Sequence, residues 1–150
     1  MEELRGGADV VLKKIMRQAA AERASDVHIE PGASFVRVRF RKDGLLSDRF
    51  CLSSSMAPNL SVRVKVLGRL DVGESRLPQD GSWAEEIDGV PYDFRISVLP
   101  SMYGETIVIR ILSGRVNFIE KNELGMRKEQ ESLFRRALSK GQGLILTTGP

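Results

Sequence analysis

The chain has 150 residues, of which 41% are hydrophobic and 29% are charged, with a formal net charge of +3 and a pI near 9.2. This length suits one ordinary domain with its own core, and this composition excludes a disordered chain. No apolar run reaches the ~20 residues that span a bilayer, and the acidic first residues do not resemble a signal peptide.

Residues 1–8 are polar and contain glycine, so we expect a loose lead-in. From Asp9 the apolar residues recur at helical spacing, which predicts an amphipathic helix that Asp9 caps and that ends near Arg23. The period then changes to two, which predicts three short antiparallel strands over residues 25–30, 35–41 and 45–52. The residues expected to face inward are Val27, Ile29, Val36, Val38 and Phe40.

The other face of these strands is polar and carries the single histidine, His28, between Asp26 and Glu30. A metal site needs more ligands than one histidine supplies, so we predict none. The arginines of the second strand fit either a solvated face paired with these carboxylates or a face toward phosphates; they are Arg37, Arg39 and Arg41. The few aromatic residues, 6% of the chain, are not interleaved with these arginines, which disfavours a nucleic-acid binder.

The lone cysteine, Cys51, has no partner in the chain, so we expect a structural role for it and a reducing, cytoplasmic compartment. A second helix follows with three apolar residues at helical spacing, Leu60, Val64 and Leu67. Its outward residues are expected to be Arg63, Lys65 and Arg69.

The segment Arg76-Leu77-Pro78-Gln79-Asp80-Gly81 separates this helical period from a strand period. Pro78 removes a backbone donor and Gly81 permits a positive φ, which predicts a fixed, exposed turn. Such a turn can present Arg76 with little entropy left to lose, although a well-made turn with a solvated arginine has the same pattern.

Two strands over residues 82–86 and 92–99 are predicted to form a hairpin at Asp88-Gly89, followed by a loop over 100–105. Residues 106–112 are apolar on both faces, which predicts a central, buried strand. Arg110 interrupts this strand and would need a carboxylate partner, for which Glu105 or Asp93 could serve.

Residues 113–125 have no period and are predicted to be a connector. A helix over 127–139 and an apolar strand over 144–148 follow, and helix then strand is half of an α/β unit. The strand ends in Gly149-Pro150, a plausible entry to the phosphate-binding loop Gly-x-x-x-x-Gly-Lys-Ser/Thr. We therefore expect a chain that stops at the threshold of a second, parallel-sheet domain.

Four stretches, in this order, resemble the N-terminal region of the secretion ATPases of type II secretion and type IV pilus assembly (the GspE/PilB class). They are R-A-S-D-V-H-I-E-P at 23–31, V-R-F-R-K-D-G at 38–44, R-L-P-Q-D-G at 76–81 and G-L-I-L-T-T-G-P at 143–150. The resemblance covers residues 9–150 and implies an α+β fold, a PAS-like domain of antiparallel strands with helices on one side. After the flexible lead-in 1–8, it implies this PAS-like domain at 9–112, a linker at 113–125 and the first helix-strand piece of a RecA-like ATPase domain at 126–150.

The resemblance implies a hexameric cytoplasmic motor, peripheral at the inner membrane, that uses ATP and Mg to move its two domains. Its partners would be the other subunits and the inner-membrane platform proteins, with no nucleic acid. The nucleotide-binding residues implied are Arg76 and Arg95, with Arg41 as a weaker candidate, and the Walker A loop would begin at Gly149 and Pro150. The Walker lysine and the acidic boxes are absent, so we expect this piece alone to bind no ATP or Mg and to hydrolyse nothing.

An alternative is a module that docks the motor to the membrane platform without a nucleotide role. The sequence also leaves open whether the system is a secretion or a pilus system, and whether Arg76 acts in its own subunit or across to a neighbour.

Overall fold

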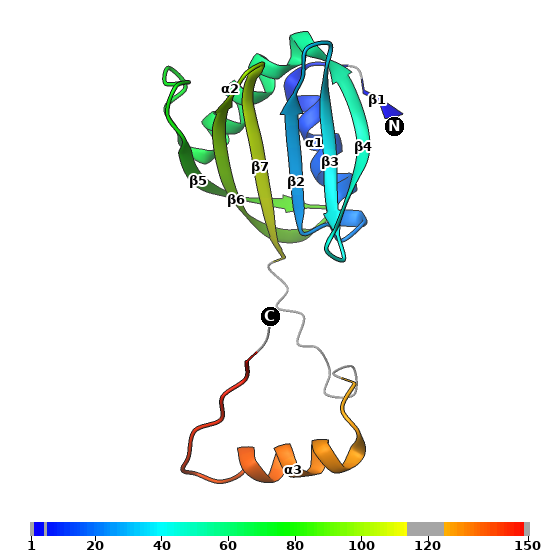
Figure 1. The fold of residues 1–150 in the computed structure, drawn as a ribbon, viewed down its shortest axis with the longest axis vertical. Helices are drawn as coiled ribbons and strands as arrows, with labels where there is room; N and C mark the ends of the chain where they lie inside the picture. The colour runs from blue at the N-terminus through cyan, green and yellow to red at the C-terminus, as the bar shows by residue number, and fades with distance from the viewer. Residues whose placement is uncertain (1, 5, 114–124, 149–150) are drawn as a thin grey trace. The chain divides into compact units, whose positions relative to one another are not determined.

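The computed structural model describes residues 2–4, 6–113 and 125–148, which belong to two compact units divided between Arg115 and Val116 (Figure 1). The strands of the first unit are β1 (Glu2–Glu3), β2 (Asp26–Pro31), β3 (Phe35–Lys42), β4 (Leu45–Ser53), β5 (Gln79–Ile87), β6 (Val90–Ser101) and β7 (Gly104–Ser113). Its helices are α1 (Ala8–Ala21) and α2 (Ala57–Gly68), the latter preceded by the 3-10 turn η1 (Ser54–Met56). The second unit contains α3 (Lys128–Leu138).

The strands of the first unit form one sheet with the order β1-β4-β3-β2-β7-β6-β5. All neighbours are antiparallel except the two-residue β1, which runs parallel to β4. Both long helices lie against the same face of the sheet (Figure 1). The predicted α+β arrangement, antiparallel strands with helices on one side, is confirmed.

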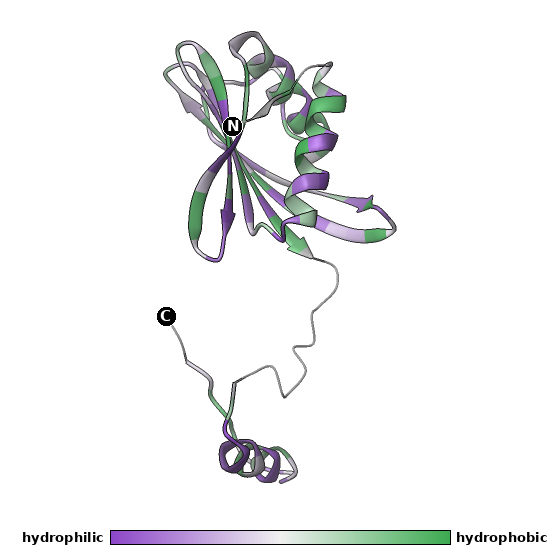
Figure 2. Ribbon diagram, turned by 90° about the vertical axis from the view of Figure 1, so that its right-hand side faces the viewer, coloured by the Kyte–Doolittle hydropathy of each residue, from purple (hydrophilic) through white to green (hydrophobic). Residues whose placement is uncertain are grey.

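The core fills the space between the helices and this inner face of the sheet. Apolar and polar residues alternate along the strands, and the apolar side chains of the inner face are buried. Figure 2 colours the ribbon by the hydropathy of each residue. The predicted inward residues of β2 and β3 are all buried, at 1% exposure or less: Val27, Ile29, Val36, Val38 and Phe40. Both predicted hairpin turns are present, with positive φ at each Asp-Gly pair as two-residue turns require.

The first residues are more ordered than the predicted lead-in. Glu2–Glu3 pair with β4, and Leu4 is buried in the core. Asp9 is not the helix cap, because α1 begins at Ala8 after Gly7, and no side chain caps it. Asp9 lies in the first turn instead and forms an ion pair with Arg63 of α2.

The predicted turn at residues 76–81 is shorter than expected, because β5 already begins at Gln79. Gly81 has no positive φ. A Cβ on Gly81 would instead lie 2.6 Å from the carbonyl oxygen of Gly68 and 2.7 Å from Cδ2 of Leu70. Glycine is therefore required here for the close approach of β5 to the end of α2. The loop predicted over 100–105 is likewise only a two-residue turn, since β6 ends at Ser101 and β7 begins at Gly104.

In the second unit the predicted helix is present as α3, and none of its residues is buried. The strand predicted over 144–148 is absent, since residues 143–148 have no regular secondary structure. A strand needs a hydrogen-bonded neighbour, and the described residues of this unit contain no other strand. Gly149, Pro150 and most of the predicted connector lie outside the described residues. No helix in the described ranges is long and apolar enough to cross a membrane.

Candidate functional site

The outer face of the sheet, opposite the helices, carries a transverse row of charged residues. The strand register places Arg41 of β3 opposite Asp26 of β2, and Asp26 opposite Arg110 of β7. Arg110 in turn lies opposite Arg95 of β6. Residues directly opposite one another share a face of the sheet, so these four side chains line up across ~14 Å, three steps between strands. We call Arg41, Asp26, Arg110 and Arg95 the arginine row.

Asp26 anchors the row because it is nearly buried, with 5% of its surface exposed. Its carboxylate accepts a hydrogen bond from Nε of Arg110 at 3.0 Å and one from Oγ of Ser25 at 2.9 Å. Nε of Arg41 lies 3.5 Å from Oδ2 of the same carboxylate. Asp26 thus orients the guanidinium group of Arg110, whose side chain stays 66% exposed. Arg41 is held by its ion pair with Asp26 and by a hydrogen bond from Nη1 to the carbonyl oxygen of Gly44 at 3.1 Å.

The carboxylate of Asp26 is held in its ionised form. Burial by itself would raise its pKa, but the hydrogen bonds from Arg110 and Ser25 and the positive charge of Arg110 outweigh burial. The pKa of Asp26 is therefore below its ordinary value. The row carries three guanidinium groups against one carboxylate, and Arg110 faces Arg95 directly, an unfavourable like-charge pair that an anion from solution would relieve.

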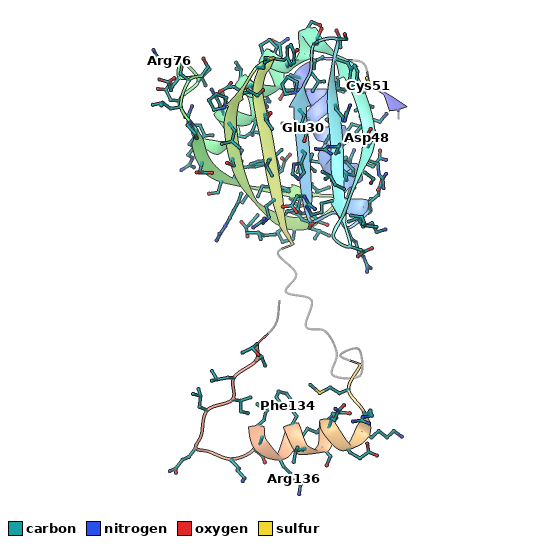
Figure 3. All side chains as sticks on the ribbon, viewed as in Figure 1. Glu30, Asp48, Cys51, Arg76, Phe134 and Arg136 are labelled. Carbon is teal, nitrogen blue, oxygen red and sulfur yellow. The ribbon has the colours of Figure 1, made fainter. Side chains whose placement is uncertain are left out.

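A second row of the same face contains His28 opposite Arg39, with Glu30 beside them; Figure 3 shows Glu30 and Asp48 among the side chains of this face. Nη2 of Arg39 donates to Oε1 of Glu30 at 2.5 Å. Arg39 and Arg41 therefore pair with carboxylates of β2, as one of the two interpretations of the sequence predicted. Burial lowers the pKa of His28, and the charge of Arg41 acts in the same direction. The described residues contain no group of three or more His, Cys, Asp or Glu that could hold a metal ion.

Arg95 contributes a guanidinium group without a partner in the described part of the chain. It lies opposite Ser82 of the edge strand β5 and lines a hollow together with Arg69 and Trp83. Arg95 is thus the row's unneutralised member, next to an open concave surface. Asp93 lines the same hollow, so the hollow contains one carboxylate beside the two arginines.

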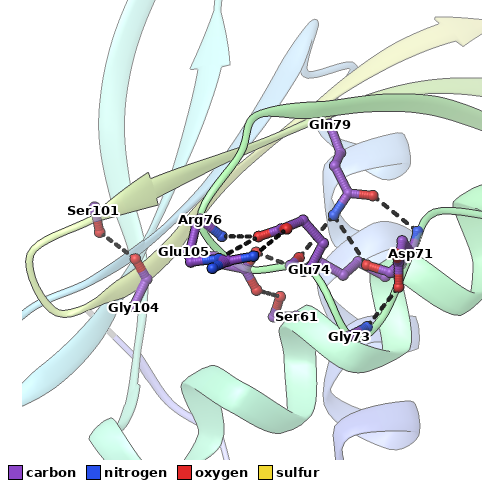
Figure 4. Close-up of polar contacts among 10 residues, drawn as sticks. Ser61, Asp71, Gly73, Glu74, Arg76, Gln79, Ser101, Gly104 and Glu105 are labelled. Carbon is purple, nitrogen blue, oxygen red and sulfur yellow. Dashed lines mark hydrogen bonds and ion pairs between the residues drawn. The ribbon is translucent and has the colours of Figure 1, made fainter.

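Arg76 lies outside the row, in the loop between α2 and β5 (Figures 3 and 4). Its side chain is 86% exposed. The carboxylate of Glu74 accepts three hydrogen bonds from Arg76: from its backbone N at 2.6 Å, from Nε at 3.3 Å and from Nη2 at 3.1 Å. On the sheet, Gln79 lies opposite Val98, and Val98 is three residues, or ~10 Å, along β6 from Arg95. Arg76 precedes Gln79 by three more residues. The structure therefore does not bring Arg76 and Arg95 together.

The sequence-based assignment of Arg110 was wrong. Arg110 is exposed rather than buried, and its partner is Asp26 rather than Glu105 or Asp93. The reason is that no helix covers the outer face of β7, so only the inner residues Ile107 and Ile109 are buried. Sequence reasoning therefore missed Arg110 as a member of the charged row. The available signal was strand alternation: Ile107 and Ile109 face the core, so Arg110 lies on the opposite, outer face.

Lys65 was also placed wrongly, because it was expected to face outward. Only 1% of its side chain is exposed, and its ammonium group pairs with Glu105 Oε1 at 2.6 Å. Helical spacing alone gave no signal for this burial, since the covering partner comes from β7.

Comparison with known proteins places the chain in a family. The family described as "Type II/IV secretion system protein" matches residues 5–150. The chain belongs to this family. Relatives include the "Protein transport protein HofB homolog" of Escherichia coli, 42% identical over 93% of this chain and 30% of the relative. The "Type II secretion system ATPase E" of Vibrio cholerae is 37% identical over 93% of this chain and 28% of its own length.

The "Type IV pilus assembly ATPase PilB" of Acinetobacter baylyi is 38% identical over 99% of the chain described here and 26% of its own length. The chain thus spans less than a third of the length of these relatives. The X-ray structure of the Legionella pneumophila ATPase DotB matches with a TM-score of 0.51 and 16% identity, over 75% of this chain and 31% of that one. This likeness concerns the fold.

Proposed function

We propose that this chain is the N-terminal part of a hexameric ATPase motor for type II secretion or type IV pilus assembly, and that its arginines meet the nucleotide held by an ATPase domain. The family and the relatives' names support a motor protein. The observation that supports the nucleotide role is the arginine row, in which Arg41 and Arg110 lie at one buried carboxylate and Arg95 lies opposite Arg110.

The chemistry of the row suits phosphate oxygens. Guanidinium groups donate paired hydrogen bonds to phosphate and stay charged at any working pH. Asp26 orients Arg110 and Arg41 in advance, so little side-chain entropy remains to be lost on binding. Arg95 and Arg110 would meet the developing charge of the β- and γ-phosphates, with Arg41 at the end of the row.

Arg76 is assigned a separate contact with the nucleotide, made from its own loop. Its distance along the sheet from Arg95 means that the two arginines would meet different parts of one nucleotide, or nucleotides of different subunits. Glu74 holds Arg76 ready for such a contact.

The remaining parts of the motor follow from the same proposal. ATP and Mg would be held by the ATPase domain, whose Walker A loop would begin at Gly149 and Pro150, and the chain alone would not be catalytic. Hydrolysis would move that domain against this one. The partners would be the other subunits and the inner-membrane platform proteins, in the cytoplasm at the inner membrane.

ATP turnover by a full-length protein that carries this sequence tests the proposal. Arg95→Ala, Arg110→Ala and Arg76→Ala should each lower turnover by orders of magnitude, since a well-placed arginine at a transferred phosphoryl group contributes ~10³–10⁵ in rate. The matched control is Arg17→Ala on α1, an exposed arginine paired with Asp88 on the hairpin between β5 and β6. Unchanged turnover in all three folded variants would refute the nucleotide role.

A docking role to the membrane platform has support of its own from the turn between β6 and β7. Met102 and Tyr103 at this turn are 87% and 53% exposed, and Leu77, which follows Arg76 in its loop, is 62% exposed. Replacing Met102 and Tyr103 by serine should abolish binding to platform proteins while ATP turnover stays normal, if docking is the function of this face. Normal binding by that variant would exclude this turn as the docking surface.

A further inference from the structure

The loop that carries Arg76 is fixed by a buried charge. Lys65, in the last turn of α2, has 1% of its side chain exposed. Removing an ammonium group from water is strongly unfavourable unless its charge is paired and its hydrogens are bonded. The partners of Lys65 therefore determine what this part of the fold can do.

The first partner is Glu105, the second residue of β7. Its Oε1 lies 2.6 Å from Nζ of Lys65, and its Oε2 accepts a hydrogen bond from the hydroxyl of Ser61. Ser61 and Lys65 are four residues apart on α2, so they share one face of the helix. Both carboxylate oxygens of Glu105 are thus held by α2, which ties the start of β7 to this helix.

The second partner of Lys65 belongs to the loop. Nζ donates to the backbone carbonyl of Glu74 at 2.6 Å. The side-chain amide of Gln79 donates to the same carbonyl at 2.9 Å and to the carbonyl of Asp71 at 3.0 Å. The Gln79 oxygen also accepts from the backbone N of Asp71 at 2.8 Å (Figure 4). The loop backbone is therefore clamped between a buried ammonium group and the first residue of β5.

The clamp reaches Arg76 through the side chain of Glu74. With its carbonyl held by Lys65, Glu74 directs its carboxylate to the backbone N, Nε and Nη2 of Arg76. Hydrogen bonds from Arg76 lower the pKa of Glu74, so the carboxylate is charged at neutral pH. A connected path runs from Glu105 through Lys65 and Glu74 to the exposed guanidinium group.

We propose that Lys65, paired with Glu105, is a positioning residue that fixes the Arg76 loop and so presents Arg76 to its anionic ligand. The proposal deepens the proposed function and rests on it where the ligand is concerned. The anchoring of the loop stands on contacts that involve no nucleotide.

The first experiment measures amide hydrogen exchange in the 150-residue chain. The double variant Lys65→Met/Glu105→Gln removes both charges together at similar volume, because breaking only one side would leave a buried, unpaired charge. The amides of Asp71 and Arg76 should exchange at least tenfold faster, while the amides of β6 and β7 keep their protection. The control Arg63→Met lies on the same helix but pairs with Asp9 of α1, and should leave the loop unchanged.

Two results would refute the proposal that Lys65 anchors the Arg76 loop. One is unchanged exchange at Asp71 and Arg76; the other is faster exchange spread evenly over all strands, which would mean a general stabilising role. Should the double variant not fold, NMR of the unmodified chain decides, because a buried, hydrogen-bonded ammonium group of Lys65 must give slowly exchanging signals. Rapid averaging with water would contradict the contacts described.

The second experiment separates this inference from the proposed function. In a full-length protein, Lys65→Met/Glu105→Gln should lower ATP turnover, and adding Arg76→Ala should lower it no further than Arg76→Ala alone, within about twofold. Independent, multiplying losses would show that Lys65 does not act through Arg76. Normal turnover in Arg76→Ala would refute the nucleotide role of Arg76, whereas the exchange experiment would still decide whether Lys65 anchors the loop.

Discussion

Asp26 is the buried carboxylate of the outer face, on the central strand β2. It is hydrogen-bonded to Ser25 and Arg110, with Arg41 close by. A carboxylate in this position stabilises the fold only while it is ionised. Its stabilising effect should therefore depend on pH in a defined direction.

We expect Asp26→Asn to lower the free energy of unfolding at pH 7 by about 1.5–3 kcal/mol, the range for hydrogen bonds to charged groups. The folded-state pKa of Asp26 lies below the unfolded value of about 3.9, so its contribution is complete above that pH and is lost as the pH falls through the folded-state pKa. Urea unfolding at pH 7 and pH 3 measures this, and the difference between wild type and variant should shrink at pH 3. Asp88→Asn, which alters an exposed pair, is the control and should change stability by less than about 1 kcal/mol.

The contact between α2 and β5 depends on Gly81, which lets the start of the strand approach the carbonyl oxygen of Gly68 at the end of the helix. Gly81→Ala should destabilise the fold by about 1–3 kcal/mol, because its Cβ would meet the Gly68 carbonyl oxygen and force the backbone to shift. Thermal unfolding measures the loss. Gly7→Ala, where a Cβ meets nothing within 4 Å, should cost less than about 1 kcal/mol, the cost of alanine in place of glycine at the start of α1.

The elements that were predictable from sequence are those whose pattern is local. Period-two alternation identified the inward residues of β2 and β3, and the Asp-Gly pairs at 43–44 and 88–89 identified both tight hairpins. The elements that were predicted wrongly depend on distant partners. Lys65 is buried because β7 supplies Glu105, and Arg110 is exposed because neither helix covers the outer face. Neither fact is contained in the spacing of nearby residues.

The arginine row illustrates the same limit at the candidate site. Arg41 and Arg95 were named from the family resemblance, but their alignment with Arg110 depends on β2 pairing with β7 across 84 residues of sequence. Single-strand patterns predict which residues share a face of one strand. They do not predict which strands become neighbours.

At the scale of the molecule, the two units differ in how they bury apolar side chains. The first has a continuous core, whereas α3 has no buried residue, and its Leu133 and Leu138 are 63% and 55% exposed. An isolated helix of 11 residues is marginal in water. We therefore expect the amides of Lys128–Leu138 to exchange at least ~10³-fold faster than those of β6 and β7, because no tertiary packing stabilises α3.

Hydrogen exchange of the 150-residue chain, followed by mass spectrometry of peptides, measures this difference. Equal protection of α3 and the central strands would contradict it. The same measurement on a longer protein should show α3 protected, if an ATPase domain supplies the strands that residues 144–148 lack here.

The sheet order also has a kinetic consequence. Strands β2, β3 and β4 follow one another as a meander, as do β5, β6 and β7, and the two meanders meet along β2 and β7. Each meander needs only short loops to close, whereas the seam between them joins residues 84 apart, as Asp26 and Arg110 are. We expect the meanders to form early and the seam to close late, so that truncating Ile29 or Ile107 at the seam mainly speeds unfolding and leaves the folding rate nearly unchanged. Stopped-flow chevrons of Ile29→Val and Ile107→Val would show this directly, and slower folding in both would place the seam in the folding nucleus instead.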